Sequence, residues 1–180
     1  RDLDEKMVRW AASQRPALGG ISFYIVFLLS IIFYTQFINP GSVFREIKFL
    51  GIMFSVSLGF LMGLADDAYN TKPFLKFVAQ FLCGLILVVT GTSIQLFNNN
   101  FLDGMLTIIW IIGIMNSINM LDNMDGITAT TVFFTLLSCL FTAYFIGNSL
   151  EPYWIFTIVS VLGALVGFLR YNINPSKMFM

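Results

Sequence analysis

Six long runs of apolar residues alternate along the chain with short polar segments. The polar segments contain residues that interrupt regular structure, as in Asn39-Pro40-Gly41. A helix needs about 20 apolar residues to cross the hydrocarbon core of a bilayer, and the runs approach that length. We therefore predict an all-α fold, a polytopic transmembrane helix bundle that forms one integral-membrane domain over residues 1–180. The six predicted spans cover residues 21–38, 47–64, 74–90, 104–118, 127–146 and 153–169. The fourth span would start at Phe101 instead if Asp103 lies at the membrane interface.

The composition supports a membrane protein and narrows its chemistry. Hydrophobic residues make up 57% of the chain and charged residues 11%, whereas soluble domains carry about 25% charged residues. The net charge is zero, so we expect no nucleic-acid partner. The chain has no histidine, which excludes histidine-based acid–base catalysis and most zinc sites within it. Cys83 and Cys139 lie in apolar runs, where we expect ordinary core or lipid-facing residues.

The charged residues form two groups when the connections between spans are assigned to alternate sides. One side holds eight of the ten Lys and Arg residues, and the other holds Arg45 and Lys48. The eight are Arg1, Lys6, Arg9, Arg15, Lys72, Lys76, Arg170 and Lys177. Because basic residues concentrate in cytoplasmic loops, we predict that the first side faces the cytoplasm. The acidic segments 66–67 and 122–125 fall on that side as well, so we predict that they share one cytoplasm-facing cleft.

A polar segment, residues 116–126, separates the fourth span from the fifth. Asn116, Asn119, Asp122 and Asp125 follow one another at steps of three residues, so neighbouring members share a helix face. Their direction drifts by about 60° per step, so either the helix breaks near residue 123 or the four line a groove that curls around it. Acids at the edge of a hydrocarbon slab need water, a cation or a metal ion as a partner. A capped helix end with solvated acids is the alternative.

A second acidic segment, Asp66-Asp67, ends the second predicted span. Adjacent carboxylates repel one another unless a cation lies between them. Mg²⁺ takes one or two carboxylates and completes its coordination with water and substrate phosphates. Lys72 and Lys76 follow closely, which suits phosphate recognition or simple charge balance. A solvated turn is the alternative for the acidic pair.

Four sets of residues carry a resemblance to a known family. The first two are Pro16-Ala17-Leu18-Gly19-Gly20 and Gly63-Leu64-Ala65-Asp66-Asp67, the latter followed by Lys76 and Gln80. The next two are Asn116, Asn119, Asp122, Asp125 and Gly126, and then Asn172, Pro175, Phe179 and Met180. In this order and spacing they resemble the motifs of the bacterial polyprenyl-phosphate N-acetylhexosamine-1-phosphate transferases. That family, glycosyltransferase family 4, includes the phospho-N-acetylmuramoyl-pentapeptide transferases.

The resemblance implies an activity, a location and a set of site residues. A sugar-1-phosphate would pass from a UDP-N-acetylhexosamine to undecaprenyl or another polyprenyl phosphate with release of UMP, the first membrane step of cell-envelope polysaccharide synthesis. The enzyme would be a multi-pass protein of the bacterial plasma (inner) membrane with a cytoplasm-facing site, and a homodimer is left open. Mg²⁺, with Mn²⁺ as the alternative, would be held by Asp66, Asp67 and Asp125. The implied catalytic residues are Asp66, Asp67, Asp122 and Asp125, and the implied substrate contacts are Lys76, Asn116, Asn119 and Asn172.

The family pattern extends beyond the chain at both ends. Members carry one span upstream, and after Phe-Met they continue with Gly-Asp, whose Asp is a magnesium ligand. A later loop with His and Arg is where we expect the determinants of sugar choice. We therefore expect the chain to be the middle of a longer enzyme and to be inactive alone.

Three other classes of membrane protein also use intramembrane acids. An aromatic-acceptor prenyltransferase is expected to show a second Asp-x-x-x-Asp, whereas Asp66 and Asp67 are adjacent. A CDP-alcohol phosphotransferase is expected to show Asp-Gly-x-x-Ala-Arg, but Thr130 follows Ala129 here. A transporter is expected to keep its acids near the bilayer midplane, whereas these lie at span ends.

Overall fold

The structure is a computed structural model that describes residues 19–38, 43–69, 71–122, 125–146 and 150–173. Motif residues 16–18 and 174–180, residue 123, and the basic residues Arg1, Lys6, Arg9, Arg15 and Lys177 lie outside this part. Every regular element in the described part is helical. The α-helices are α1 (Gly19–Phe33), α2 (Ile47–Tyr69), α3 (Pro73–Val89), α4 (Asn100–Leu121), α5 (Ile127–Ile146) and α6 (Pro152–Asn172). A π-helical turn, η1 (Tyr34–Ile38), extends α1, and a short 3₁₀ turn, η2 (Val43–Arg45), precedes α2.

The predicted all-α architecture is confirmed, and α5 has the predicted bounds. The predicted start of the fourth span at residue 104 is wrong, because α4 begins at Asn100, one residue before the alternative start at Phe101. The Asn99 side chain caps α4 by accepting hydrogen bonds from the N–H groups of Phe101 and Leu102, at 3.0 and 3.3 Å. The Asp103 carboxylate is buried inside the extra turn and accepts hydrogen bonds from loop N–H groups. Asp103 therefore lies in the first turn of α4, as the alternative start near Phe101 requires.

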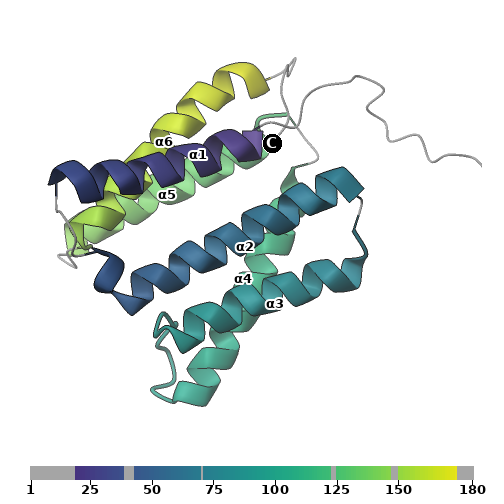
Figure 1. Cartoon of the computed structure of the whole chain (residues 1–180), viewed down its shortest axis with the longest axis vertical. Helices are drawn as coiled ribbons and strands as arrows, with labels where there is room; N and C mark the ends of the chain where they lie inside the picture. Colours follow the sequence, from purple (N-terminus) through teal and green to yellow (C-terminus); the bar gives the residue numbers. More distant parts are fainter. Residues whose placement is uncertain (1–18, 39–42, 70, 123–124, 147–149, 174–180) are drawn as a thin grey trace, which may run out of the picture.

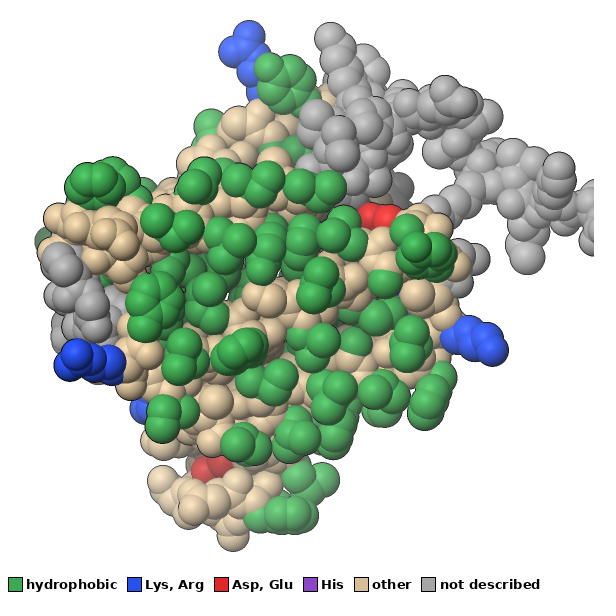
Figure 2. Space-filling model, viewed as in Figure 1, with side chains coloured by type: hydrophobic (Ala, Val, Ile, Leu, Met, Phe, Trp, Pro, Cys, Tyr) green, Lys and Arg blue, Asp and Glu red, His purple; other side chains and the backbone are tan. Residues whose placement is uncertain are grey.

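The helices have the length and surface of membrane spans. Five of them in the described part are long and apolar enough to cross a bilayer, while α3 is a shorter apolar helix of 17 residues. Apolar side chains cover much of the outer surface (Figure 2), including Phe74, Ile109 and Phe134. A soluble protein rarely exposes such large apolar patches, whereas lipid tails solvate them well. The chain is therefore a polytopic helical membrane protein.

The bundle contains two groups of three helices, α2–α3–α4 and α1–α5–α6 (Figure 1). Small residues allow close packing within the first group: Gly51 of α2 lies against Thr90, next to the end of α3, and Gly84 of α3 lies against Ile108 of α4. The two groups meet where the Tyr24 ring stacks on Phe60, with ring centroids 4.0 Å apart. Tyr24 thereby joins α1 to α2.

Successive helices run in opposite directions. The ends of α2, α4 and α6 consequently lie at the same end of the bundle as the starts of α1, α3 and α5 (Figure 1). Both acidic segments lie at this end, as predicted. The opposite end is closed by aromatic side chains, where Phe49 packs edge-to-face on Tyr153 and the Tyr153 hydroxyl donates to Glu46 at 2.7 Å. Which end faces the cytoplasm remains a prediction.

Candidate functional site

A pocket of about 380 Å³ lies where the ends of α2 and α4 meet the start of α1. Its polar side chains are Asp66 and Asp67 of α2, Asn119 of α4 and Asp122 just after α4. The remaining lining is apolar or glycine: Gly20, Ile21, Gly59, Phe60, Gly63, Leu64, Met115 and Ile118. The two acidic segments, more than 50 positions apart in the sequence, therefore meet in one pocket.

Asp66 is held by three contacts from the start of α3 and the turn before it. One carboxylate oxygen accepts hydrogen bonds from the backbone N–H and the hydroxyl of Thr71, at 3.1 and 2.9 Å. The other oxygen forms an ion pair with the Lys76 ammonium at 2.7 Å. The sequence leaves phosphate recognition and charge balance open for Lys76; the ion pair with Asp66 is compatible with both, and a phosphate contact stays a prediction. Asp66 thus ties α2 to α3.

Asp67 and Asp122 influence each other electrostatically across the pocket. Asp122 follows the last turn of α4, and its backbone N–H donates to the Ile118 carbonyl at 3.2 Å. Desolvation raises the pKa of the Asp122 carboxyl to about 6, and the negative charge of Asp67 adds to this rise. Two carboxylates that disfavour each other's ionised form make a place where a cation is favoured.

The two predicted substrate-contact amides of α4 lie in different surroundings. Asn119 lines the pocket, whereas Asn116 lies one turn earlier and pairs with Gln80 of α3. Each amide donates to the other's oxygen, at 3.1 and 3.0 Å, and Asn116 also donates to the Ile112 carbonyl at 3.0 Å. Gln80 belongs to one of the sequence motifs, which indicates no role for it. Gln80 lies four residues after Lys76, so the two share a face of α3, and this spacing is the sequence signal for a related role.

Helix α4 ends at Leu121 and α5 begins at Ile127. Of the two predicted alternatives, a helix break near residue 123 is therefore confirmed over one helix with a curling groove. Gly126 has a φ of +76°, a conformation that suits glycine. Its backbone N–H donates to the side-chain oxygen of buried Asn172 at 2.9 Å. Asp125 lines a separate cavity of about 410 Å³ together with Gly126, Ile127, Thr130, Thr131 and Ile173. Asp125 is therefore not a lining residue of the pocket that holds Asp66, Asp67 and Asp122.

The carboxylates permit a test of the expected metal site. Within the described ranges, no three Asp, Glu or Cys side chains lie close enough together to hold a metal ion. Asp66 is engaged by Lys76, and Asp125 lies outside the shared pocket. Asp67 and Asp122 could supply the one or two carboxylates that Mg²⁺ often takes, with water and phosphates as its other ligands, and the metal itself stays a prediction.

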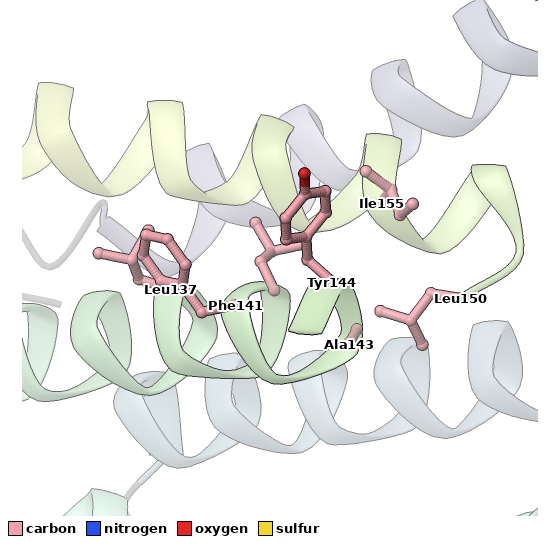
Figure 3. A pocket seen from close by; sticks show the side chains of 7 residues that line it. Leu137, Phe141, Ala143, Tyr144, Leu150 and Ile155 are labelled. Carbon is pink, nitrogen blue, oxygen red and sulfur yellow. The ribbon is translucent and has the colours of Figure 1, made fainter. Parts of the chain in front are cut away.

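A larger cavity of about 570 Å³ lies between the end of α5 and the start of α6, at the opposite end of the bundle. Figure 3 shows its lining, with Leu137, Phe141 and Tyr144 from α5 beside Leu150 and Ile155. The lining is almost entirely apolar and contains no carboxylate, amide or basic side chain. This cavity therefore lacks the groups that phosphate or metal chemistry requires.

Comparisons with known proteins agree with the motifs. A probable undecaprenyl-phosphate N-acetylglucosaminyl 1-phosphate transferase of Bacillus subtilis (strain 168) is 27% identical, over 92% of this chain and 46% of that protein. Phospho-N-acetylmuramoyl-pentapeptide-transferases of Streptococcus thermophilus (strain CNRZ 1066) and Thermoanaerobacter sp. (strain X514) are 27% and 30% identical. These two matches cover 94% and 93% of this chain and 54% and 56% of the relatives.

The chain thus spans about half the length of the curated relatives it matches. No solved structure matches it. The profile of glycosyl transferase family 4 matches residues 49–180, a stretch that includes both acidic segments and the helices that carry them. On this match, the chain belongs to glycosyl transferase family 4.

Proposed function

We propose that the protein transfers an N-acetylhexosamine-1-phosphate from a UDP-sugar to undecaprenyl or another polyprenyl phosphate and releases UMP. The observation that carries this proposal is the shared pocket, in which Asp66 and Asp67 of α2 lie with Asn119 and Asp122 at the end of α4. The names of the relatives in Bacillus, Streptococcus and Thermoanaerobacter support the same reaction class.

The reaction asks for the kind of site that the pocket offers. An oxygen of the lipid phosphate attacks the sugar-bearing phosphorus of the UDP-sugar, and the bond from that phosphorus to UMP breaks. Because both reactants are anions, catalysis depends on positioning and charge neutralisation more than on covalent chemistry. Asp67 and Asp122 are the residues that would hold Mg²⁺, or Mn²⁺ in its place. When bound, the ion would neutralise the diphosphate and stabilise the leaving UMP.

The lining of the pocket suits a lipid anion. Ile21, Phe60 and Met115 form apolar walls along the helices, and the polar residues lie at the helix ends. A polyprenyl chain can stay in the apolar part while its phosphate meets the polar end. A water-soluble UDP-sugar would arrive from the aqueous side, which the distribution of Lys and Arg predicts to be the cytoplasm. We accordingly assign the protein to the bacterial plasma membrane.

The test is a UMP-release assay on the full-length protein with undecaprenyl phosphate and either UDP-N-acetylglucosamine or UDP-N-acetylmuramoyl-pentapeptide. We expect release that requires lipid acceptor and Mg²⁺, and that falls at least tenfold in Asp67→Asn and Asp122→Asn. Glu151→Gln is the matched control, because Glu151 is an exposed acid at the opposite end of the bundle. Absence of UMP release with any UDP-sugar would overturn the proposal in favour of a prenyltransferase, a CDP-alcohol phosphotransferase or a transporter.

A further inference from the structure

Helix α3 presents two polar side chains, one turn apart, to the helices that carry the acids. Lys76 pairs with Asp66 of α2, and Gln80 pairs with Asn116 of α4. Because α3 packs against both α2 and α4, these two contacts link the acidic end of α2 to the polar face of α4. Neither Lys76 nor Gln80 lines the pocket. Lys76 pairs with Asp66, which is a lining residue, whereas Gln80 pairs with Asn116, which is not.

The Gln80–Asn116 contact is geometrically specific. A single hydrogen bond lets a side chain swing, but two reciprocal amide bonds fix the plane and the separation of both groups. A third bond, from Asn116 to the Ile112 carbonyl of its own helix, fixes the Asn116 side chain relative to the α4 backbone. The Gln80 side chain is buried, with 8% of its surface exposed. The pair therefore couples α3 to the rotation of α4 about its axis.

That rotation decides where the pocket residues of α4 point. Asn119 lies three residues after Asn116, and Asp122 lies three residues further on, so a turn of α4 moves both relative to Asp67. A misplacement of about 1 Å in a catalytic site can cost about 10²-fold in rate. Stability alone does not require this arrangement, because two apolar side chains of similar shape can replace a buried hydrogen-bonded pair with little loss.

We infer that Gln80 is a positioning residue of this site, which acts through Asn116 to hold Asn119 and Asp122 opposite Asp67. The role of Gln80 in turnover rests on the proposed transferase function, whereas its role in the geometry of α4 does not. Gln80 itself contacts neither substrate nor metal in this assignment. In this assignment the polar partner of Asn116 is Gln80 of the same chain, and not a bound substrate or metal ion.

The experiment uses the full-length protein with Gln80→Leu, Gln80→Asn, Asn116→Gln and the exchanged pair Gln80→Asn/Asn116→Gln. We expect Gln80→Leu to lower kcat by about 10²-fold while the KM values for the UDP-sugar and the lipid acceptor change less than about threefold. The exchanged pair keeps the total side-chain length across the contact. Its kcat should therefore be at least tenfold higher than the kcat of Gln80→Asn or of Asn116→Gln alone. Gln95→Leu is the matched control, because Gln95 is exposed and lies at the opposite end of the bundle.

A second measurement is independent of activity. Spin labels on Tyr69→Cys and Leu121→Cys, at the exposed ends of α2 and α4, report the distance between those ends in a Cys139→Ser background. We expect a broader or shifted distance distribution in Gln80→Leu and a wild-type distribution in the exchanged pair.

Wild-type kcat and distances in Gln80→Leu would overturn the inference. Failure of the exchanged pair to recover kcat would overturn it too, because Asn116 would then act on the substrate itself. An inactive wild-type protein whose distances still respond to Gln80→Leu would count only against the proposed function.

Discussion

The side-chain oxygen of Asn172 accepts a hydrogen bond from the backbone N–H of Gly126, 46 positions earlier in the chain, at 2.9 Å. Asn172 is buried at the end of α6, and Gly126 forms the turn just before α5. Gly126 directly precedes α5, where an N–H group has no acceptor within the helix, so Asn172 supplies the acceptor from another helix. The end of α6 thereby fixes the turn next to Asp125.

Asn172→Ala should destabilise the protein, because the N–H of Gly126 would be left buried without its partner. The expected cost is about 1–3 kcal/mol, seen as a lower Tm in detergent. Asn172→Asp retains an acceptor oxygen of the same reach and should stay closer to the wild-type Tm. An unchanged Tm in Asn172→Ala together with lost turnover would instead support the substrate contact that the family resemblance implies.

Much of the fold is predictable from the sequence because the apolar runs and their polar breaks are local signals. The bounds of α5 follow directly from them. The start of α4 does not, because it depends on the Asn99 cap and on Asp103, whose carboxylate binds the N–H groups of Leu96, Phe97 and Asn99. A charged residue normally marks a span end, which puts the start at residue 104, four residues late, whereas the alternative start at Phe101 is one residue late.

The meeting of the two acidic segments is also predictable, since antiparallel spans bring alternate connections to one end. The partners of the polar residues are not, because they depend on how each helix is rotated about its axis. Asn116 pairs with Gln80 and Asn172 pairs with Gly126, although the family resemblance implies substrate contacts for both asparagines. Those implied contacts with substrate remain predictions. Motif spacing identifies the polar positions, and only tertiary packing decides which neighbour each one binds.

Lys76→Ala should impair substrate use more than folding. Lys76 and Asp66 are each partly exposed, and ion pairs of this kind contribute at most about 1 kcal/mol. Asp66 would also keep its two hydrogen bonds to Thr71. We expect a small change in Tm and at least a tenfold loss of kcat/KM for the lipid acceptor. Lys48→Ala, at the start of α2 on the opposite end, is the control, and near-normal kcat/KM in Lys76→Ala would mean that Lys76 only balances charge.

Asp122 should make the stability of the protein depend on pH. Its carboxyl has an ordinary pKa of 3.8, and desolvation raises this pKa to about 6, with a further contribution from Asp67. Folding therefore favours the protonated form. The resulting stabilisation is complete below about pH 4 and is lost as pH rises through about 6. The Tm of Asp122→Asn should accordingly exceed that of the wild type by a margin that grows from about pH 4 and levels off above about pH 6.

The control for this titration is Asp67→Asn. Removing the Asp67 charge lowers the free-energy cost of ionising Asp122. The increase in Tm that Asp122→Asn causes should therefore be smaller in a protein that also carries Asp67→Asn than in the wild type. Tm measured in detergent, without divalent cations, provides the comparison. A margin that stays constant across this pH range would show that the Asp122 carboxyl is not desolvated in the folded protein.

Asp125→Asn separates a catalytic acid from a structural one. The substitution keeps the size and hydrogen-bonding capacity of the side chain and removes its charge. If Asp125 holds metal or orders the charged end of the nucleotide, turnover of the full-length protein should fall by about 10²-fold or more, equivalent to about 2.7 kcal/mol of lost transition-state stabilisation. Tm should change little, because an amide at the membrane edge is less costly than an acid.

The competing view of Asp125 is a helix cap beside the turn at Gly126. It expects the reverse result, a stability loss of about 1 kcal/mol with turnover intact. The separate cavity around Asp125 makes the comparison informative, because Asp125→Asn replaces no residue that lines the pocket of Asp66, Asp67 and Asp122. A loss of turnover in Asp125→Asn would therefore extend the functional site beyond that pocket. Turnover and Tm measured on the same purified variant decide the question, and a fully active but less stable protein would remove Asp125 from the catalytic set.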